Sequence, residues 1–208
     1  MSNKIIAWDF DGVLNANIRD GRFIWADTFE ADIGLSRRAF VQHIFGQNLT
    51  PILTGQEDLR DRVSEWARIA GYAPGADALL DYWFPRDMFP DADVLSLIDD
   101  LRASGVRHVM ATNNEWRRTA FIEAAPDFSP RMDRIFAAGP MGLCKPDPRF
   151  FETVATQMET APDQMILVDD HADNIAAARE LGWSAYHFTP QTRAGLPVFL
   201  HSETGAAE

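Results

Sequence analysis

Two aspartates, Asp9 and Asp11, stand two positions apart where the apolar run Ile5–Trp8 ends, directly before Gly12. The run is apolar at successive positions, a pattern typical of a strand buried on both faces in a parallel sheet. Open α/β sheets bind ligands at the carboxyl ends of their strands, so both carboxylates are expected at a ligand site. A carboxylate there can act as a nucleophile or as a general acid and base. Taken alone, the pair also fits a turn followed by a helix cap.

Three further stretches repeat this placement of polar residues after apolar runs. They are Thr112 and Asn113 at the end of an expected strand over 106–112, Lys145 in the loop beyond an expected strand over 134–137, and Asp169 and Asp170 after an expected strand over 165–168. Because right-handed crossovers bring the carboxyl ends of parallel strands to one edge, we expect these side chains at a single site. Each residue alone has a plainer interpretation, as a helix cap or a surface lysine. The conjunction, in this order, is what indicates chemistry.

Four carboxylates gathered at one edge of a sheet would repel one another. A hard divalent cation with oxygen ligands relieves that repulsion, and Mg²⁺ is the common choice. With Asp11 protonated, the other three aspartates carry a formal charge of −3, which Mg²⁺ and Lys145 balance with +3. Thr112 and the amides at the start of the following helix offer hydrogen bonds to phosphoryl oxygens. The set predicts a site in which one aspartate attacks phosphorus and a second protonates the leaving oxygen.

Composition limits the classes of protein to which the chain can belong. Its 208 residues are 46% hydrophobic and 24% charged, as in one large globular domain or a core with an insertion. The formal charge of −12 argues against nucleic acid or an anionic membrane as partner. There is no apolar run of the roughly 20 residues that a transmembrane helix needs, and the N-terminus lacks the features of a secretory signal. With a single cysteine, Cys144, the sequence fits a reducing compartment, and we expect a cytoplasmic protein.

The elements that must position the acidic residues can be inferred from periodicity. Strands and helices alternate after residue 90, which predicts a parallel sheet with helices on both faces. Residues 17–86 are patterned instead as helices and turns without a clear buried strand. The helices expected there begin near Phe23, after Ser36, at Asp58 and after Pro74. The sequence thus predicts an α/β core of residues 1–16 and 87–208 with a small all-helical cap over 17–86, and the tail 201–208 is expected to be frayed.

The four polar motifs resemble those of the haloacid dehalogenase-like (HAD) hydrolase superfamily. They are Asp9-Phe10-Asp11-Gly12-Val13, Ala111-Thr112-Asn113, Lys145-Pro146 and Val168-Asp169-Asp170. The resemblance covers essentially the whole chain and implies a Rossmann-like α/β fold. The helical segment after the first motif is similar to the cap of the subgroup that contains β-phosphoglucomutase, haloacid dehalogenases and sugar-phosphate phosphatases. In that subgroup the cap closes over the substrate and excludes bulk water.

The resemblance also implies roles for the acidic residues. Asp9 is the expected nucleophile, which becomes an aspartyl-phosphate, and Asp11 is the expected general acid–base. The expected ligands of Mg²⁺ are the Asp9 carboxylate, the main-chain carbonyl of Asp11, and Asp170, with Asp169 bound directly or through water. These residues match the superfamily motifs one by one.

The remaining motif residues are expected to handle the phosphate. By the same resemblance, Thr112 and the Asn113 amide bind phosphoryl oxygens, and Lys145 steadies both Asp9 and the transferring group. The implied partner is a small phosphorylated metabolite, and a small cap favours a small polar ester, with sugar phosphates as the first guess. Candidate specificity residues on the cap side are Asn15, Arg22, Trp25, His43, Phe45 and Gln47, with His171 beside the acidic pair.

Several activities are compatible with this pattern. A Mg²⁺-dependent phosphatase fits best, and a phosphomutase uses the same core with a cap that delays hydrolysis of the phosphoenzyme. Haloacid dehalogenases typically lack the second aspartate of the first motif, so Asp11 disfavours that activity. A catalytically inactive binding module is expected to have lost at least one of Asp9, Asp11, Lys145 and Asp170, and all four are present. Nothing in the sequence indicates an oligomeric state.

Overall fold

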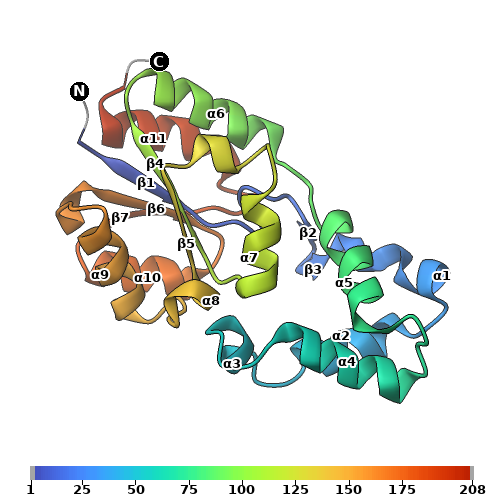
Figure 1. The fold of residues 1–208 in the computed structure, drawn as a ribbon. Coiled ribbons are helices and arrows are strands. Elements are labelled where there is room, and N and C mark those ends of the chain that lie inside the picture. Colours follow the sequence, from blue (N-terminus) through green and yellow to red (C-terminus); the bar gives the residue numbers. More distant parts are fainter. Residues whose placement is uncertain (1–2, 207–208) are drawn as a thin grey trace.

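The computed structural model describes residues 3–206. Its centre is a five-stranded sheet in the order β5-β4-β1-β6-β7, in which every neighbouring pair is parallel (Figure 1). The strands are β1 (Ile5–Trp8), β4 (Arg107–Thr112), β5 (Arg134–Ala137), β6 (Met165–Asp169) and β7 (Ser184–His187). The predicted α/β fold with a parallel sheet is therefore confirmed.

Helices cover both faces of this sheet (Figure 1). On one face lie α6 (Ala92–Ala103), α7 (Trp116–Glu123) and α11 (Leu196–Thr204), and on the other lie α9 (Pro148–Gln157) and α10 (Ala172–Glu180). In β1, Ile6 and Trp8 pack against the first group, while Ile5 and Ala7 pack against the second. Because both faces are buried, the strand is apolar at every position, which is the pattern seen in the sequence.

Residues 17–86, which we call the cap, lie beside the sheet and contain their own apolar core (Figure 1). The elements of the cap are β2 (Ile18–Arg19), β3 (Arg22–Phe23), the 3₁₀ helix η1 (Ile24–Thr28), α1 (Phe29–Ile33), α2 (Arg37–Phe45), α3 (Thr50–Leu53), α4 (Leu59–Ala70) and α5 (Gly75–Arg86). Aromatic rings dominate the core, with Phe40 and Trp66 in edge contact at 4.9 Å between centroids. Ser36 caps α2 through its side-chain oxygen, so that helix begins after Ser36 as the sequence predicts, and Asp58 caps α4 in the same way.

Two local expectations differ from the structure. The first cap helix does not begin at Phe23, because β2 and β3 pair as an antiparallel hairpin whose tip, Asp20 and Gly21, has positive φ angles of 51° and 69°. The prediction of a frayed tail is also wrong for residues 201–204, because α11 continues to Thr204 and its Leu200 is completely buried. Residues 207–208 of the expected tail lie outside the described residues. No helix within the described part of the chain is long and apolar enough to cross a membrane.

A buried histidine in the sheet makes folding stability depend on pH. His108 of β4 is fully buried, its Nδ1 accepts a hydrogen bond from Trp8 Nε1 at 2.9 Å, and its Nε2 has no partner among the described residues. Burial, and secondarily the charge of Arg102, lowers the pKa of His108 from 6.5 to about 4. The folded state resists protonation that the unfolded state accepts, so stability is lost as pH falls from 6.5 towards 4.

We predict that this histidine alone removes about 3 kcal/mol of unfolding free energy between pH 7 and pH 4. The measurement is urea unfolding at both pH values for the wild type and for His108→Gln, which keeps an acceptor for Trp8 without a titrating ring. The variant is expected to lose less stability on acidification. Equal losses in the two proteins would show that His108 does not carry this pH dependence.

Candidate active site

The sheet register brings acidic residues from two strands together. Trp8 of β1 lies level with Val168 of β6, and the amide of Asp9 donates to the carbonyl of Val168 at 2.9 Å. Asp9 and Asp169 therefore leave the sheet side by side. Carboxylate oxygens of Asp9, Asp169 and Asp170 lie within 4.8 Å of one another. The convergence expected from the spacing of these motifs is present in the structure.

Lys145 supplies the positive charge inside this cluster. It follows α8 (Ala138–Met141), and its Nζ lies 2.5 Å from Asp169 Oδ2 and 3.0 Å from Asp9 Oδ1, with a side chain completely shielded from solvent. Burial lowers the pKa of Lys145, but the charges of Asp169 and Asp9 outweigh burial and raise it. The side-chain amide of Asn113 fixes the lysine backbone, donating to the Lys145 carbonyl and accepting from the Lys145 amide, both at 2.8 Å.

The two oxygens of Asp9 have different surroundings. Oδ1 accepts from the Phe10 amide at 2.7 Å as well as from Lys145, whereas Oδ2 forms no hydrogen bond with the described residues. Burial raises the pKa of Asp9 well above its ordinary value, Lys145 opposes this shift, and the charges of Asp169 and Asp170 add to it. Asp9 also lines the cavity described below. One oxygen is thus anchored while the other is left for a ligand or for attack.

Asp169 and Asp170 differ in how far their carboxylates are already hydrogen-bonded. Asp169 is fully buried, and both its oxygens are engaged, by Lys145, by the His171 amide at 2.8 Å and by Asn174 Nδ2 at 3.0 and 3.1 Å. The Asp170 carboxylate forms no such bonds within residues 3–206 and lines the cavity. Burial and then the charge of Asp169 raise the pKa of Asp170. This contrast suits Asp170 to direct metal binding and Asp169 to holding Lys145.

Gly12 leaves room beside Asp170. Its φ is +79°, which favours glycine, and a Cβ built there would lie 2.5 Å from Asp170 Oδ2. Three carboxylates and one ammonium carry a formal charge of −2, which a divalent cation would neutralise. Oxygen donors, excess negative charge and space that a side chain would fill make these residues a fit for Mg²⁺.

Three amide side chains hold Asp11 in place. Asn15 Nδ2 and Asn17 Nδ2 lie 3.2 and 2.7 Å from Oδ1, and Asn114 Nδ2 lies 3.2 Å from Oδ2. Asn114 also donates to Thr112 Oγ1 at 2.7 Å, so it links two of the predicted site residues. Sequence reasoning missed Asn17 and Asn114. Their only signal was proximity to the first two motifs.

A buried ion pair lies behind this amide network, at the return from cap to core. Asp87 Oδ1 accepts from Asn17 at 2.7 Å, and its Oδ2 lies 3.1 Å from Arg118 Nη2. Burial raises the pKa of Asp87 to about 7 while Arg118 opposes the shift and Asp11 adds to it. Arg118 Nη1 also donates to the Phe84 carbonyl at 3.0 Å, so α7 holds the end of α5. Neither Asp87 nor Arg118 belongs to a recognisable motif.

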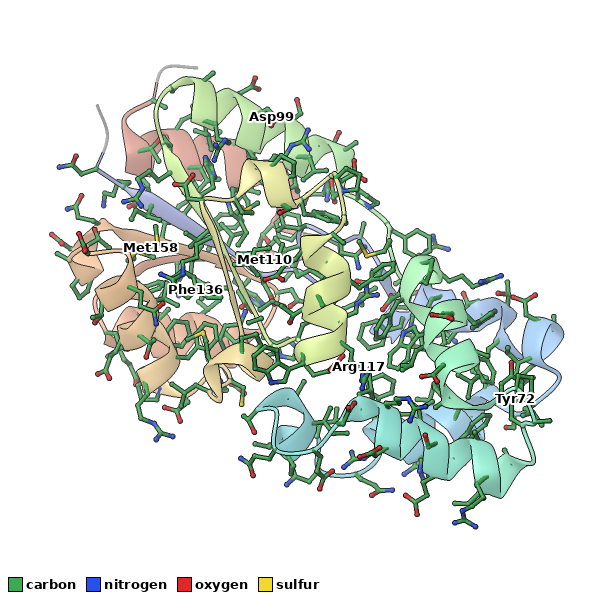
Figure 2. All side chains as sticks on the ribbon, viewed as in Figure 1. Tyr72, Asp99, Met110, Arg117, Phe136 and Met158 are labelled. Atoms are coloured by element: carbon green, nitrogen blue, oxygen red, sulfur yellow. The ribbon has the colours of Figure 1, made fainter. Side chains whose placement is uncertain are left out.

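A cavity of about 430 Å³ opens between the core and the cap. From the core it is lined by the predicted residues Asp9, Asp11, Thr112, Asn113, Lys145 and Asp170, together with other polar groups. From the cap it is lined by apolar residues alone, which are Ile18, Phe23, Ile44, Phe45, Leu49, Ile52, Leu53, Leu59, Trp83 and Phe84. The cap is tied to the core where Arg117 of α7 pairs with Asp58 at 2.5 and 2.6 Å. Figure 2 shows Arg117 at the side of the core that faces the cap.

The candidate specificity residues fare unevenly. Phe45 and His171 line the cavity. Asn15 is buried and donates a hydrogen bond to Asp11, and Trp25 is buried in the cap core. The other candidates do not line the cavity. His43 Nε2 lies 3.5 Å from a Glu65 carboxylate oxygen, and the side chains of Arg22 and Gln47 are exposed. Only His43 of these three lies on a helix, α2, whose apolar residues Ile44 and Phe45 line the cavity, while Arg22 is in β3 and Gln47 lies in the loop after α2.

The acidic cluster with its buried lysine lies at the carboxyl edge of a parallel α/β sheet, where such sheets bind their ligands, and its oxygen donors suit a hard cation. The family model of the haloacid dehalogenase-like hydrolases matches residues 3–182. The chain belongs to this family.

Two of the named relatives are phosphatases. The chain is 35% identical over 109 residues to the sesquiterpene phosphatase astK of Aspergillus oryzae, covering 48% of this chain and 51% of that protein. It is 28% identical over 127 residues to phosphatase MT3486 of Mycobacterium tuberculosis, covering 59% of this chain and 57% of that protein. The chain thus spans about half the length of these curated relatives.

A solved structure shares the fold. The HAD family enzyme bt-2542 of Bacteroides thetaiotaomicron, in complex with magnesium and inorganic phosphate, superposes with a TM-score of 0.70 at 19% identity, covering 89% of this chain and 94% of that chain. At this identity the likeness concerns the fold.

Proposed function

We propose that the protein is a Mg²⁺-dependent phosphatase that hydrolyses a small phosphate monoester through an aspartyl-phosphate. The observation that carries the proposal is the state of Asp9, whose Oδ1 is anchored by Lys145 and Phe10 while Oδ2, at the cavity, has no partner among the described residues. The proposal also includes the division of the chain into an α/β core domain and a cap domain over residues 17–86. Relatives named phosphatases support phosphate ester hydrolysis over dehalogenation.

The first step transfers the phosphoryl group to Asp9. Its Oδ2 attacks phosphorus, the bond between phosphorus and the ester oxygen breaks, and protonated Asp11 gives its proton to the leaving oxygen, so the alcohol departs neutral. Lys145 stays 3.0 Å from Asp9 Oδ1 and stabilises charge on the transferring group, while Thr112 and the Asn113 amide bind phosphoryl oxygens.

The second step returns the enzyme to its starting state. Asp11, now ionised, takes a proton from water as the water oxygen attacks phosphorus, and the bond between phosphorus and Asp9 Oδ2 breaks. Inorganic phosphate leaves and the Asp9 carboxylate is restored. The three amides of Asn15, Asn17 and Asn114 hold Asp11 in one position through both proton transfers.

Asp9, Asp170 and the Asp11 carbonyl would hold the metal, with Asp169 behind them. When bound, Mg²⁺ supplies Lewis-acid stabilisation of phosphoryl charge and offsets repulsion between the carboxylates and the substrate. A phosphate dianion can then approach a cluster that otherwise carries an excess of negative charge.

The proposal is tested with Asp11→Asn and two esters, an alkyl phosphate and 4-nitrophenyl phosphate. Loss of the general acid is expected to lower phosphoryl transfer from the alkyl ester by about 10²- to 10⁴-fold, and that from the nitrophenyl ester much less, because nitrophenolate leaves without a proton. Rapid-quench measurement of the released alcohol separates this step from phosphoenzyme hydrolysis, which should be slow with both esters.

Two controls accompany this experiment. Asp20→Asn removes an exposed carboxylate at the hairpin tip and should leave both activities unchanged. EDTA should abolish turnover in every variant that has it, and added Mg²⁺ should restore it. Equal losses for the two esters would refute the role of Asp11, and turnover that survives EDTA would refute the metal requirement.

A further inference from the structure

We infer that the substrate is the phosphate monoester of an apolar aliphatic alcohol, whose hydrocarbon chain lies against the cap. The inference rests on the proposed phosphatase function and names the substrate class of that site. Its basis is the division of the cavity into a polar floor, formed by the core, and an apolar wall, formed by the cap.

Half of the residues in the apolar wall are partly exposed to the cavity and are not fully buried in the cap core. Five residues of the wall are only half-buried, namely Ile18, Phe23, Phe45, Leu49 and Leu53. Within the described chain, no cap residue with a charged, hydroxyl or carboxamide side chain lines this cavity. A surface of this kind gains free energy when a hydrocarbon covers it.

Part of the wall is a continuous aromatic surface. The rings of Phe23 and Phe45 stack at 5.8 Å between centroids, Phe45 meets Trp83 edge-on at 5.6 Å, and Trp83 meets Phe84 at 5.7 Å. Each ring is fixed by its neighbour, so the wall is formed before a ligand binds. A preformed apolar surface binds a hydrocarbon with little loss of side-chain entropy.

The apolar wall begins next to the reacting groups. A Cβ built on Gly12 would lie 2.5 Å from Asp170 Oδ2 and 3.4 Å from Ile18 Cδ1, so Ile18 borders the acidic cluster itself. An ester whose phosphorus lies at Asp9 would therefore direct its organic group onto apolar residues from the first carbon atoms onward.

Three polar groups of the core that line the same cavity, Glu115, Arg118 and Asp87, are already engaged, whereas the side chains of His171 and Asp173, next to Asp170 in the chain, form no hydrogen bond with the described residues. Glu115 accepts from the amides of Arg117 and Arg118 at 2.7 and 2.6 Å, Arg118 donates to the Phe84 and Asp87 carbonyls at 3.0 and 2.9 Å, and Asp87 accepts from Asn17. Sugar hydroxyls placed against Glu115, Arg118 and Asp87 would lose water without finding a free partner, which is unfavourable. The lining therefore favours an alkyl or isoprenoid chain over a sugar.

The experiment is a homologous series of n-alkyl phosphates from ethyl to octyl, compared with glucose 6-phosphate, in the presence of Mg²⁺. Each added methylene that enters the cavity should raise kcat/KM about fourfold, since burial of a methylene contributes about 0.8 kcal/mol. Hexyl phosphate should exceed glucose 6-phosphate, which has the same number of carbon atoms. A flat series, or a preference for the sugar ester, would overturn the inference while leaving the phosphatase proposal intact.

Binding of n-alkylphosphonates, which cannot be hydrolysed at the phosphorus–carbon bond, provides a readout that does not depend on turnover. Calorimetry with Mg²⁺ present should show Kd falling by a similar factor per methylene and a negative heat-capacity change. If no ester is hydrolysed but this trend appears, the phosphatase proposal fails and the apolar site stands. If the phosphonates show no trend, the inference fails.

A pair of variants locates the effect in the cap. Leu53→Gln introduces an amide into the wall and should lower kcat/KM for octyl phosphate about tenfold more than for ethyl phosphate. Val41→Gln is the matched control, because Val41 is an exposed cap residue that does not line the cavity. It should leave kcat/KM unchanged for both octyl and ethyl phosphate. Equal effects of Leu53→Gln on both esters would show that the chain does not reach this wall.

Discussion

Asp9→Asn is expected to reduce phosphate release by about 10⁴-fold or more, because the carboxamide cannot act as the nucleophile. No phosphoenzyme should form when the variant is mixed with an ester and Mg²⁺. The substitution is nearly isosteric, and the oxygen of the new carboxamide can still accept from Phe10 and Lys145, which hold Asp9 Oδ1 at 2.7 and 3.0 Å. The variant should therefore fold.

Stability measurements separate this chemical loss from misfolding. In metal-free buffer the variant should be at least as stable as the wild type, since it removes a carboxylate whose pKa is raised by burial and by the charges of Asp169 and Asp170, against the opposing charge of Lys145. Added Mg²⁺ should stabilise the variant less than the wild type, because one ligand has been weakened. The matched control is Asp100→Asn, an exposed carboxylate of α6, which should behave as wild type in both assays. Turnover above about 1% of wild type in Asp9→Asn would contradict the assignment of the nucleophile.

The site residues could be found in the sequence because the signals that mark them are local. Asp9 directly follows the apolar strand β1, and Asp169 ends β6, whose other four residues are apolar, and that pattern identifies both the strand and its carboxyl end. Parallel topology then requires the ends of neighbouring strands to meet, which is why residues 160 positions apart could be placed together.

Other features depend on contacts that no local pattern encodes. Asn17 from the cap and Arg118 from α7 both reach Asp87, and their importance follows from burial of that one carboxylate. The hairpin at Asp20 and Gly21 is short enough that helical periodicity in the following residues concealed it. The apolar cavity wall was hidden for a different reason, because half-buried cap residues such as Leu53 are indistinguishable in sequence from residues of the cap core.

Lys145→Met is expected to destabilise the protein by about 3–5 kcal/mol in metal-free buffer at pH 7. The side chain of Lys145 is completely shielded from solvent and is paired with two carboxylates, Asp169 at 2.5 Å and Asp9 at 3.0 Å. Removing the ammonium leaves both acids buried without a compensating charge. Methionine retains the length and apolar stem of the lysine, so the loss measures the charge. Urea unfolding of the two proteins gives the difference directly.

A double-mutant cycle tests whether that loss arises from the ion pair. Asp169→Asn alone should also be destabilising, but the combined Lys145→Met and Asp169→Asn variant should be more stable than the sum of the single losses predicts, by about 2 kcal/mol or more. The comparison pair is Arg60 with Asp77, which are 2.6 Å apart but exposed, and removing Arg60 should destabilise the protein far less than removing Lys145. Both pairs have short contacts, and the larger loss is expected at Lys145 because its pair is buried. If instead the buried cycle is additive, Lys145 does not hold the acidic cluster together through its charge, and its part in catalysis must be limited to contacts with the substrate.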